Sequence, residues 1–222
     1  MQQPPPVQRL RVRYAKRGRA RFTSHRDFAR AFERALRRAE IPMAYSSGFS
    51  PHPRISYANA AATGAASEAE YLEIALALTC QPEAVREALD QALPTGLDVL
   101  EVVSATATPL TELLQASRWL IDLVNAEPDA VRAAVAAFVA SASVPVERMT
   151  RSGRRVFDAR VAVESSRMCG DRLVEVVIRH GEPLVPRRCG GGTASRGPRP
   201  RRRSAAAADS AGAGPVPRRP DR

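Results

Sequence analysis

The chain has 222 residues, of which 44% are hydrophobic and 26% are charged, and its formal net charge is +11. This composition predicts a soluble globular protein of one large domain or two small ones. A membrane protein is excluded because the longest run of small apolar residues, 133–140, is too short to cross a bilayer, and a cytoplasmic location is expected since residues 1–10 contain no secretory signal.

The charge is divided into blocks along the chain. The net charge is +10 over residues 1–60, −10 over residues 61–147, +3 over residues 148–186 and +8 over residues 187–222. A concentrated positive block attracts phosphate backbones and releases their counterions. We therefore expect the first 60 residues to contact nucleic acid, and the acidic middle segment to stay clear of it and to be available for a protein partner.

Residues 9–14 alternate basic and apolar side chains, which predicts a β-strand with one buried face. The apolar positions are Leu10, Val12 and Tyr14, and the basic positions are Arg9, Arg11 and Arg13. The strand would therefore present arginines on the side of the sheet opposite the core. A basic turn that contains Arg17 and Arg19 follows it.

Ser24 and Asp27 have the spacing of a capping pair and predict that a helix begins there. Apolar residues then recur at helical spacing at Phe28, Phe32, Ala35, Leu36 and Ala39. The helix is expected to end before Pro42, which cannot continue it. Its arginines lie mainly off the apolar stripe and are expected on the exposed side: Arg26, Arg30, Arg34, Arg37 and Arg38.

Four further elements complete the first predicted domain. Residues 55–58 and 71–78 are predicted strands, Pro82 lies in the first turn of a second helix, and residues 97–103 form another strand. The resulting order, β-α-β-β-α-β, predicts an α+β fold of the ferredoxin-like type, in which one face of the sheet stays open. We assign this domain to residues 7–104.

The next segments are a predicted linker over residues 105–116 and a second, smaller α+β half over residues 117–186. Residues 82–93 and 128–139 have similar sequences, each between apolar strand-like runs, which suggests an internal repeat. The alternative is that proline and an acidic residue suit the first turn of any helix.

Three patterns follow toward the end of the chain. A hairpin is expected around the turn at 151–154, between the strand-like sequences VPVERMT and RVFDARVAV, and residues 172–178 are predicted as the last strand. Residues 187–222 lack periodicity and are rich in Gly, Pro, Ala and Arg, which predicts a disordered basic tail. A shifted reading frame in a GC-rich gene is the alternative origin of this tail.

Motifs for cofactors and metals do not occur in the sequence. It has no P-loop, no dinucleotide-binding glycine pattern, no HExxH and no cysteine triad of a radical-SAM enzyme. The three cysteines are far apart and odd in number, which argues against a disulfide framework, a metal site and a disulfide-linked partner. We therefore expect no cofactor and no metal, and no catalytic residue in the leading interpretation.

His25 and His52 support an alternative in which the protein is an enzyme. Two histidines can act as base and acid in RNA transesterification near neutral pH. The protein would then be a metal-independent endoribonuclease of ferredoxin-like type. The simpler alternative makes His25 an exposed first-turn residue and His52 a stiff loop residue between two prolines.

Residues 45–57 combine aromatic, small and basic residues, a mixture that suits single-stranded nucleic acid. Bases stack on exposed aromatic rings, and guanidinium groups bind phosphates. Tyr45, Phe49, His52 and Arg54 are the candidate contacts to bases. For Tyr45 and Phe49, packing against the core is the alternative and the more common role of aromatic residues.

A set of motif residues occurs in this order: Ser24-His25, Asp27, Tyr45-Ser46, Gly48-Phe49, Pro51-His52-Pro53 and Glu70-Tyr71. With these residues the chain resembles a bacterial family of radical-SAM-linked proteins, a domain of unknown function that occurs beside or fused behind a radical-SAM enzyme. The resemblance covers residues 9–186 and implies a radical-SAM enzyme as partner. Members of that family continue into another ordered segment where this chain has its basic tail.

The leading interpretation is an accessory RNA-binding module, itself non-catalytic, that presents tRNA or rRNA to a separate radical-SAM modification enzyme. The expected contacts to RNA are Arg9, Arg11, Arg13, Arg17, Arg19, Arg26, Arg30, Tyr45, Phe49, His52 and Arg54. This interpretation requires the arginines to converge on one uncovered side of the first domain. A second alternative is a protein-interaction subunit of a radical-SAM system that contacts no nucleic acid.

Overall fold

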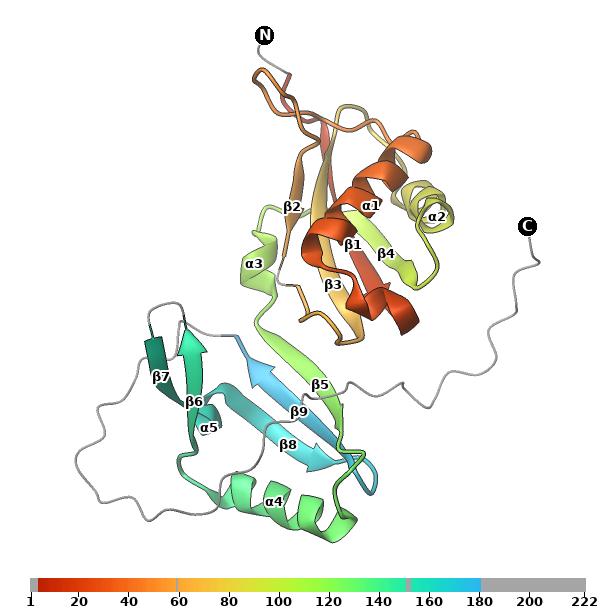
Figure 1. Cartoon of the computed structure of the whole chain (residues 1–222). Helices are drawn as coiled ribbons and strands as arrows, with labels where there is room; N and C mark the ends of the chain where they lie inside the picture. Colours follow the sequence, from red (N-terminus) through yellow and green to blue (C-terminus); the bar gives the residue numbers. More distant parts are fainter. Residues whose placement is uncertain (1–3, 59, 151–152, 181–222) are drawn as a thin grey trace. The chain divides into compact units, whose positions relative to one another are not determined.

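The computed structural model describes residues 4–58, 60–150 and 153–180. These residues form two compact units, and along the chain the first ends at Leu110 and the second begins at Thr111. Over these ranges the structure is of the mixed α+β class, with antiparallel sheets and five α-helices (Figure 1). None of the described helices is long and apolar enough to cross a membrane. The predicted tail over residues 187–222 lies outside the described residues.

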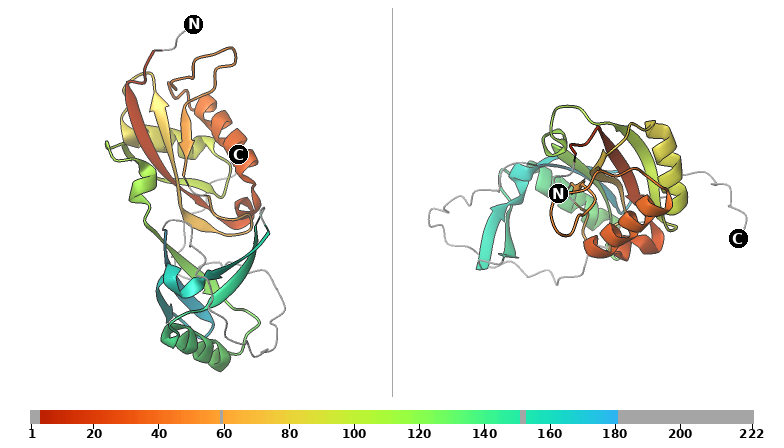
Figure 2. Two further views of the ribbon diagram at one scale, coloured as in Figure 1. Left: turned by 90° about the vertical axis from the view of Figure 1, so that its left-hand side faces the viewer. Right: turned by 90° about the horizontal axis from the view of Figure 1, so that it is seen from above.

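The first unit contains one four-stranded sheet and two longer helices. Its elements are β1 (Gln8–Lys16), the 3-10 helix η1 (Gly18–Phe22), α1 (His25–Arg38), β2 (Ile55–Tyr57), β3 (Ser67–Leu76), α2 (Pro82–Ala92) and β4 (Leu97–Ser104). The strands pair antiparallel in the order β2-β3-β1-β4. Helices α1 and α2 cover one face of this sheet (Figures 1 and 2).

The core of the first unit lies between β1 and the two helices. Leu10 and Val12 are fully buried, and the ring of Tyr14 stacks on Phe28 of α1 with 4.3 Å between the ring centroids. Phe28 also lies 5.7 Å from the ring of Phe32. The alternating pattern of β1 therefore predicted both the strand and its buried side correctly.

Helix α1 begins with the predicted cap. The Asp27 backbone N–H donates to Ser24 Oγ at 3.2 Å, and the Ser24 hydroxyl donates to the Asp27 carboxylate at 2.6 Å. These bonds satisfy one of the N–H groups that the first turn of a helix leaves without a backbone acceptor. The cap fixes where α1 starts and therefore which of its side chains face the sheet.

The second unit is built around a three-stranded sheet. Its elements, after the short helix α3 (Leu110–Leu113), are β5 (Ala116–Asp122), α4 (Pro128–Ala140), β6 (Pro145–Thr150), β7 (Gly153–Asp158), α5 (Ala159–Ala162), β8 (Val163–Met168) and β9 (Leu173–Arg179). The sheet has the order β5-β9-β8, and β6 pairs only with β7. Among the described residues of this unit, Val131 and Val174 are the only hydrophobic residues that are almost fully buried.

The position of α4 differs from the repeat that the sequence suggests. Helix α4 leads from β5 toward β8, and β9 lies between these strands, just as α1 leads from β1 to β2 with β3 between them. In topology α4 therefore corresponds to α1 and not to α2. Both helices begin with proline and have an acidic residue in the first turn, a preference of helix starts that accounts for part of the similarity of residues 82–93 and 128–139.

The predicted hairpin is present as β6 and β7, but its second strand is shorter than expected. The Asp158 carboxylate accepts a hydrogen bond from the backbone N–H of Arg160 at 2.9 Å, which starts α5. Residues 159–162 are therefore helical, although their sequence predicts a strand. The last predicted strand is present as β9.

Candidate nucleic-acid interface

The three arginines of β1 lie opposite carboxylates of the neighbouring strands. Arg9 and Arg11 both contact Glu73 of β3, at N–O distances of 3.1 and 3.3 Å. Arg13 lies 3.5 Å from Glu101 of β4. The register explains these contacts, because Arg11 pairs with Glu73 and Arg13 pairs with Glu101 across the sheet.

Arg17, in the turn after β1, is paired in the same way. Its guanidinium lies 2.7 Å from Glu68 and 3.1 Å from Asp98, and the hydrogen bond to Glu68 raises the pKa of Arg17. This side of the first unit thus sets four arginines against four carboxylates: Arg9, Arg11, Arg13 and Arg17 against Glu68, Glu73, Asp98 and Glu101. It is not a basic platform, so the expected convergence of the predicted arginines on this face is not observed.

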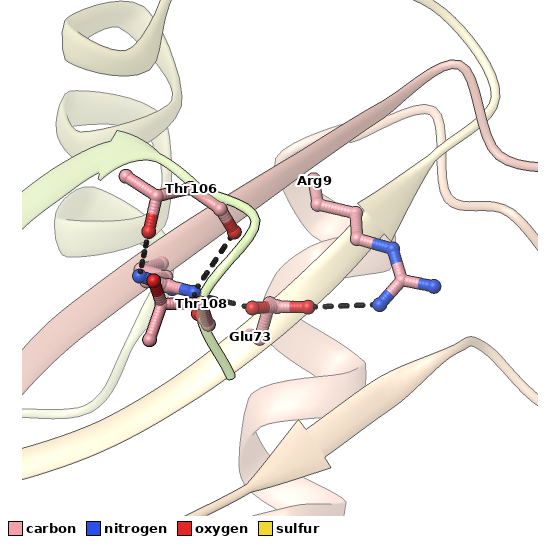
Figure 3. Close-up of polar contacts among 5 residues, drawn as sticks. Arg9, Glu73, Thr106 and Thr108 are labelled. Atoms are coloured by element: carbon pink, nitrogen blue, oxygen red, sulfur yellow. Dashed lines mark hydrogen bonds and ion pairs between the residues drawn. The ribbon is translucent and has the colours of Figure 1, made fainter. Parts of the chain in front are cut away.

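Arg11 is a structural residue of the first unit, and Figure 3 shows its partners Glu73, Thr106 and Thr108. Its side chain is only 9% exposed, and besides Glu73 it contacts the segment that follows β4. The guanidinium donates to Thr106 Oγ1 at 3.0 Å, to the Thr106 carbonyl at 3.2 Å and to the Thr108 carbonyl. These acceptors surround the cation, so it fixes the chain after β4 and does not face solvent as a phosphate ligand.

A second set of arginines lies on the outer side of α1. We define the arginine ridge as Arg26, Arg30, Arg34 and Arg37. All are exposed, and no ion pair or hydrogen bond joins their side chains to another residue in the described ranges. Residues spaced by three or four positions lie on one face of a helix, so the ridge is a continuous row of positive charge.

Two nearby arginines complete the account of the predicted basic residues. Arg19 of η1 is exposed and, like the ridge, its side chain has no partner among the described residues. Arg38 is different, because its guanidinium donates to the Ala92 carbonyl at the end of α2 at 3.2 Å. It therefore contributes to the packing of α1 against α2 and is not included in the ridge.

The segment between α1 and β2 forms a closed loop, which we call the 45–53 loop. The Ser46 backbone N–H donates to the His52 carbonyl at 2.9 Å, and the His52 N–H donates to Ser46 Oγ at 3.0 Å. Arg54 Nε donates to the Tyr45 carbonyl at 3.2 Å. These bonds hold the base of the loop, and they make Arg54 a residue that positions the loop.

The tip of the 45–53 loop presents an aromatic ring to solvent. Phe49 is fully exposed, and Tyr45 at the base is about one-third exposed, at 38%. Gly48 has φ of +132°, a conformation that residues with a Cβ rarely adopt, so a glycine is needed beside Phe49. The described structure therefore excludes the core-packing alternative for Phe49 and leaves its ring accessible.

The loop lies at the end of the first unit where α1 terminates (Figures 1 and 2). Its closing bonds fall between residues 46 and 52, a few positions beyond Arg38, the last residue of α1. An accessible aromatic ring and a row of arginines are thus contributed by successive parts of the chain. Chemically, the row of arginines suits phosphates and the exposed ring suits stacking on a base.

The two candidate catalytic histidines are exposed and lie apart. The ring of His25 contacts Tyr57, at the end of β2, with 5.0 Å between centroids. His52 precedes the start of β2 by three residues. His25 begins α1, whereas the loop that contains His52 lies at the end of the unit where this helix of 14 residues terminates (Figure 1), and 14 helical residues span about 21 Å. The two histidines therefore do not form an acid–base pair around one phosphate.

Sequence reasoning missed two buried charged residues, Lys16 in β1 and Glu70 in β3. Lys16 is 3% exposed and donates to the Thr23 carbonyl at 3.3 Å, and Glu70 is 2% exposed and accepts from the Ala61 backbone N–H at 3.2 Å. Each lies two residues beyond the last apolar residue of the alternating buried positions in its strand. This alternation is the signal that could have identified both residues as buried. Both side chains bind backbone groups of connecting segments, so their role is structural.

Tyr57→Phe is expected to match the natural protein in stability at neutral pH or to exceed it by up to about 1 kcal/mol. The reason is that the Tyr57 hydroxyl is buried without a hydrogen-bond partner among the described residues. Burial, together with the Glu33 carboxylate, raises the pKa of Tyr57 to about 12. Ionisation of the buried phenol therefore costs folding free energy; this cost is absent below about pH 10 and grows as the pH rises toward 12.

The measurement is urea denaturation of both proteins at neutral pH and at about pH 11. The natural protein should lose stability relative to Tyr57→Phe at the higher pH, whereas Tyr45→Phe, in the loop, should follow the natural protein. Identical pH dependence for Tyr57→Phe and the natural protein would contradict the assignment.

The described residues contain no cluster of three or more histidine, cysteine, aspartate or glutamate side chains that could hold a metal ion. Cys80 and Cys169 are free thiols, and Cys189 lies outside the described ranges.

Comparison with known proteins gives one family match. A model of a bacterial family described as "Uncharacterized protein conserved in bacteria (DUF2344)" matches residues 9–185. A search of curated proteins finds no match. The matched range contains the arginine ridge and the 45–53 loop.

Proposed function

Because the chain belongs to the bacterial family DUF2344 through residues 9–185, a range that includes the arginine ridge and the 45–53 loop, we propose that it is a non-catalytic RNA-binding module. It would hold RNA for a separate radical-SAM enzyme that modifies tRNA or rRNA. The partner enzyme in this proposal rests on the sequence resemblance of the motif residues alone. The RNA contact rests on the surface described above.

One observation carries the RNA contact: the arginines divide into two classes. Those of β1 and its turn face carboxylates, whereas the ridge on α1 has no acidic partner among the described residues. An uncompensated row of guanidinium groups attracts a phosphate backbone and releases its counterions. The proposed phosphate contacts are accordingly Arg19 and the ridge, and the β1 arginines and Arg17 are left out.

The 45–53 loop supplies the second part of the proposed surface. An exposed Phe49 ring can stack on an unpaired base, and this contact tolerates any base because each has an aromatic face. Tyr45 and His52 lie at the base of the same loop and are the further proposed contacts to bases. The surface therefore suits single-stranded RNA or a loop of a folded RNA.

We also assign the first unit to the ferredoxin-like sandwiches. The element order β-α-β-β-α-β, the strand order β2-β3-β1-β4 and the two helices on one face support this assignment. The fold hosts many functions, so it adds nothing to the argument for RNA.

The test compares two triple variants that remove the same charge from different sides of the unit. Arg26, Arg30 and Arg34 are changed to Gln in the first variant, and Arg9, Arg13 and Arg17 in the second. Binding of a labelled mixed-sequence single-stranded RNA is measured over a range of salt concentrations. The first variant should bind RNA roughly 100-fold more weakly at about 0.1 M salt. Its slope of log affinity against log salt concentration should be shallower by about 2, and the second variant should change little in either quantity.

Phe49→Ala provides an independent arm of the same test. It should weaken binding by about 1–3 kcal/mol without changing the salt slope, because stacking does not release counterions, and Phe49→Tyr should retain binding. Equal losses in both triple variants would contradict the ridge assignment. An absence of salt-dependent RNA binding would favour the protein-interaction subunit, and RNA cleavage that His25→Ala or His52→Ala abolishes would favour the nuclease.

A further inference from the structure

The outer edge of β5 is unpaired in the second unit. The sheet order β5-β9-β8 places β5 at one edge, and no described residue pairs with its other side. An edge strand presents a row of backbone N–H and C=O groups that can pair with another strand. β5 has seven residues, Ala116–Asp122, and pairs with β9 in regular register along its whole length.

The hydrogen bonds to β9 show which backbone groups point outward. The His180 N–H donates to the Gln115 carbonyl, and the Leu123 N–H donates to the Arg172 carbonyl. Residues that exchange backbone hydrogen bonds alternate along an antiparallel pair. The odd-numbered residues of β5 therefore bond to β9, and the N–H and C=O groups of Arg118, Leu120 and Asp122 point to the open edge.

Among the edges of the two larger sheets, β2, β4 and β8 are less suited to pairing than β5. β2 has only three residues. β8 has a register irregularity between Val163 and Ser165, and β4 has one where it pairs with β1 at Arg13 and Tyr14. Short strands and bulges are devices that blunt an edge. β5 has neither, and Leu120, one residue past its centre, is 46% exposed.

We infer that β5 pairs with β5 of a second copy of this chain, antiparallel about a two-fold axis at Leu120. In this register Leu120 faces Leu120 of the partner subunit, and the outward-pointing backbone N–H and C=O groups of the two residues form hydrogen bonds with each other. Arg118 faces Asp122 of the partner subunit, and this opposite-charge pair occurs twice because of the symmetry. On the other face of the sheet, Trp119 faces the partner's Ile121.

The charges of β5 favour this register. The Asp122 carboxylate has no partner among the described residues. Arg118 lies 3.7 Å from Glu175, but Glu175 is held more closely by Arg167 at 2.8 Å, and the Arg118 side chain is 71% exposed. A register centred one residue earlier would place Arg118 opposite Leu120 and leave both charges without a counterpart. Dimerisation is thus centred on Leu120 and is independent of the RNA proposal.

The first experiment is sedimentation equilibrium of the full chain, from roughly 1 to 100 μM, the range expected for a small interface. The natural protein should dimerise reversibly. Arg118→Asp and Asp122→Arg each replace two attractive contacts with two repulsive ones, so each should raise the dissociation constant roughly tenfold or more. The double variant with both changes restores the pairing and should return to within about threefold of the natural protein.

Cysteine cross-linking tests the register directly. Leu120→Cys lies on the two-fold axis, where facing Cα atoms are about 5.5 Å apart, within the range for a disulfide. It should form a covalent dimer on mild oxidation, above the background of the natural protein's cysteines. Ala116→Cys, at the start of the same strand, should not, because its copy would lie roughly 27 Å away.

Two results would overturn the inference. One is a natural protein that stays monomeric over the whole concentration range. The other is a dimer that the charge variants leave unchanged and that Leu120→Cys does not cross-link. Circular dichroism of each variant checks that the second unit remains folded, and RNA binding is not needed for any readout.

Discussion

Phe28→Ala is expected to destabilise the first unit by about 3–5 kcal/mol, because it leaves a cavity in the centre of the core. Phe28 is 1% exposed and stacks on Tyr14 at 4.3 Å with an interplanar angle of 5°. Its ring also lies 5.7 Å from Phe32 and 6.2 Å, edge-on, from Tyr57. These neighbours come from β1, α1 and β2, so the cavity cannot be closed by moving one element.

The measurement is urea denaturation followed by far-UV circular dichroism. The chain has one tryptophan, Trp119, which lies in β5 of the second unit, so tryptophan fluorescence reports that unit separately. Phe22→Ala is the control: this ring is 59% exposed and lies under the Arg21 guanidinium at 4.8 Å, so its removal should cost less than about 1 kcal/mol. Similar losses for both variants would contradict the position of Phe28 in the core.

Arg11→Ala is expected to cost about 2–4 kcal/mol in unfolding free energy. The substitution removes the buried donor shared by Glu73, Thr106 and Thr108, and it leaves two carbonyl groups and part of a carboxylate without a partner. Groups that lose water on folding and gain no hydrogen bond carry the full penalty of their desolvation. The effect should be seen as a lower urea midpoint with an unchanged slope.

Arg9→Ala is the matched control for Arg11→Ala. Both arginines bind Glu73 at similar distances, but the Arg9 side chain is 60% exposed and that of Arg11 is 9% exposed. An exposed ion pair contributes less than about 1 kcal/mol, so Arg9→Ala should have a small effect. A loss for Arg9→Ala as large as that for Arg11→Ala would show that burial does not decide the energy of this pair.

The sequence was a good guide to the faces of single elements. The period of two in β1 predicted that Leu10, Val12 and Tyr14 are buried, and the period of 3.6 in α1 predicted that its arginines lie outside. These patterns are local, because each depends only on the geometry of one strand or helix. The capping pair of Ser24 and Asp27 was predictable for the same reason.

What the sequence could not provide was the register between strands. The arginines of β1 were expected to make an open basic face, and this expectation was wrong because β3 and β4 place Glu73 and Glu101 directly opposite Arg11 and Arg13. The acidic residues belong to a segment that, counted along the chain, seemed separate from the basic block. Pairing brings the two blocks together in space.

Distances between loops and helix ends could not be predicted from the sequence either. His25 and His52 are 27 positions apart in the sequence. Their distance in space depends on the direction of β2, which no local sequence pattern predicts. For Lys16 and Glu70 the sequence pattern was present but was not used. Both positions continue the alternation of buried residues in their strands, yet a charged residue is predicted to be exposed because charged residues are rarely buried without partners.

The contacts of Arg11 also determine where an independently produced first domain has to stop. The last strand ends at Ser104, but the guanidinium is held by groups at Thr106 and Thr108. A recombinant fragment cut at the strand end would deprive a buried cation of these acceptors and admit water beside it. A fragment of the first unit should therefore end beyond Thr108, so that it keeps the residues after β4 that bind Arg11.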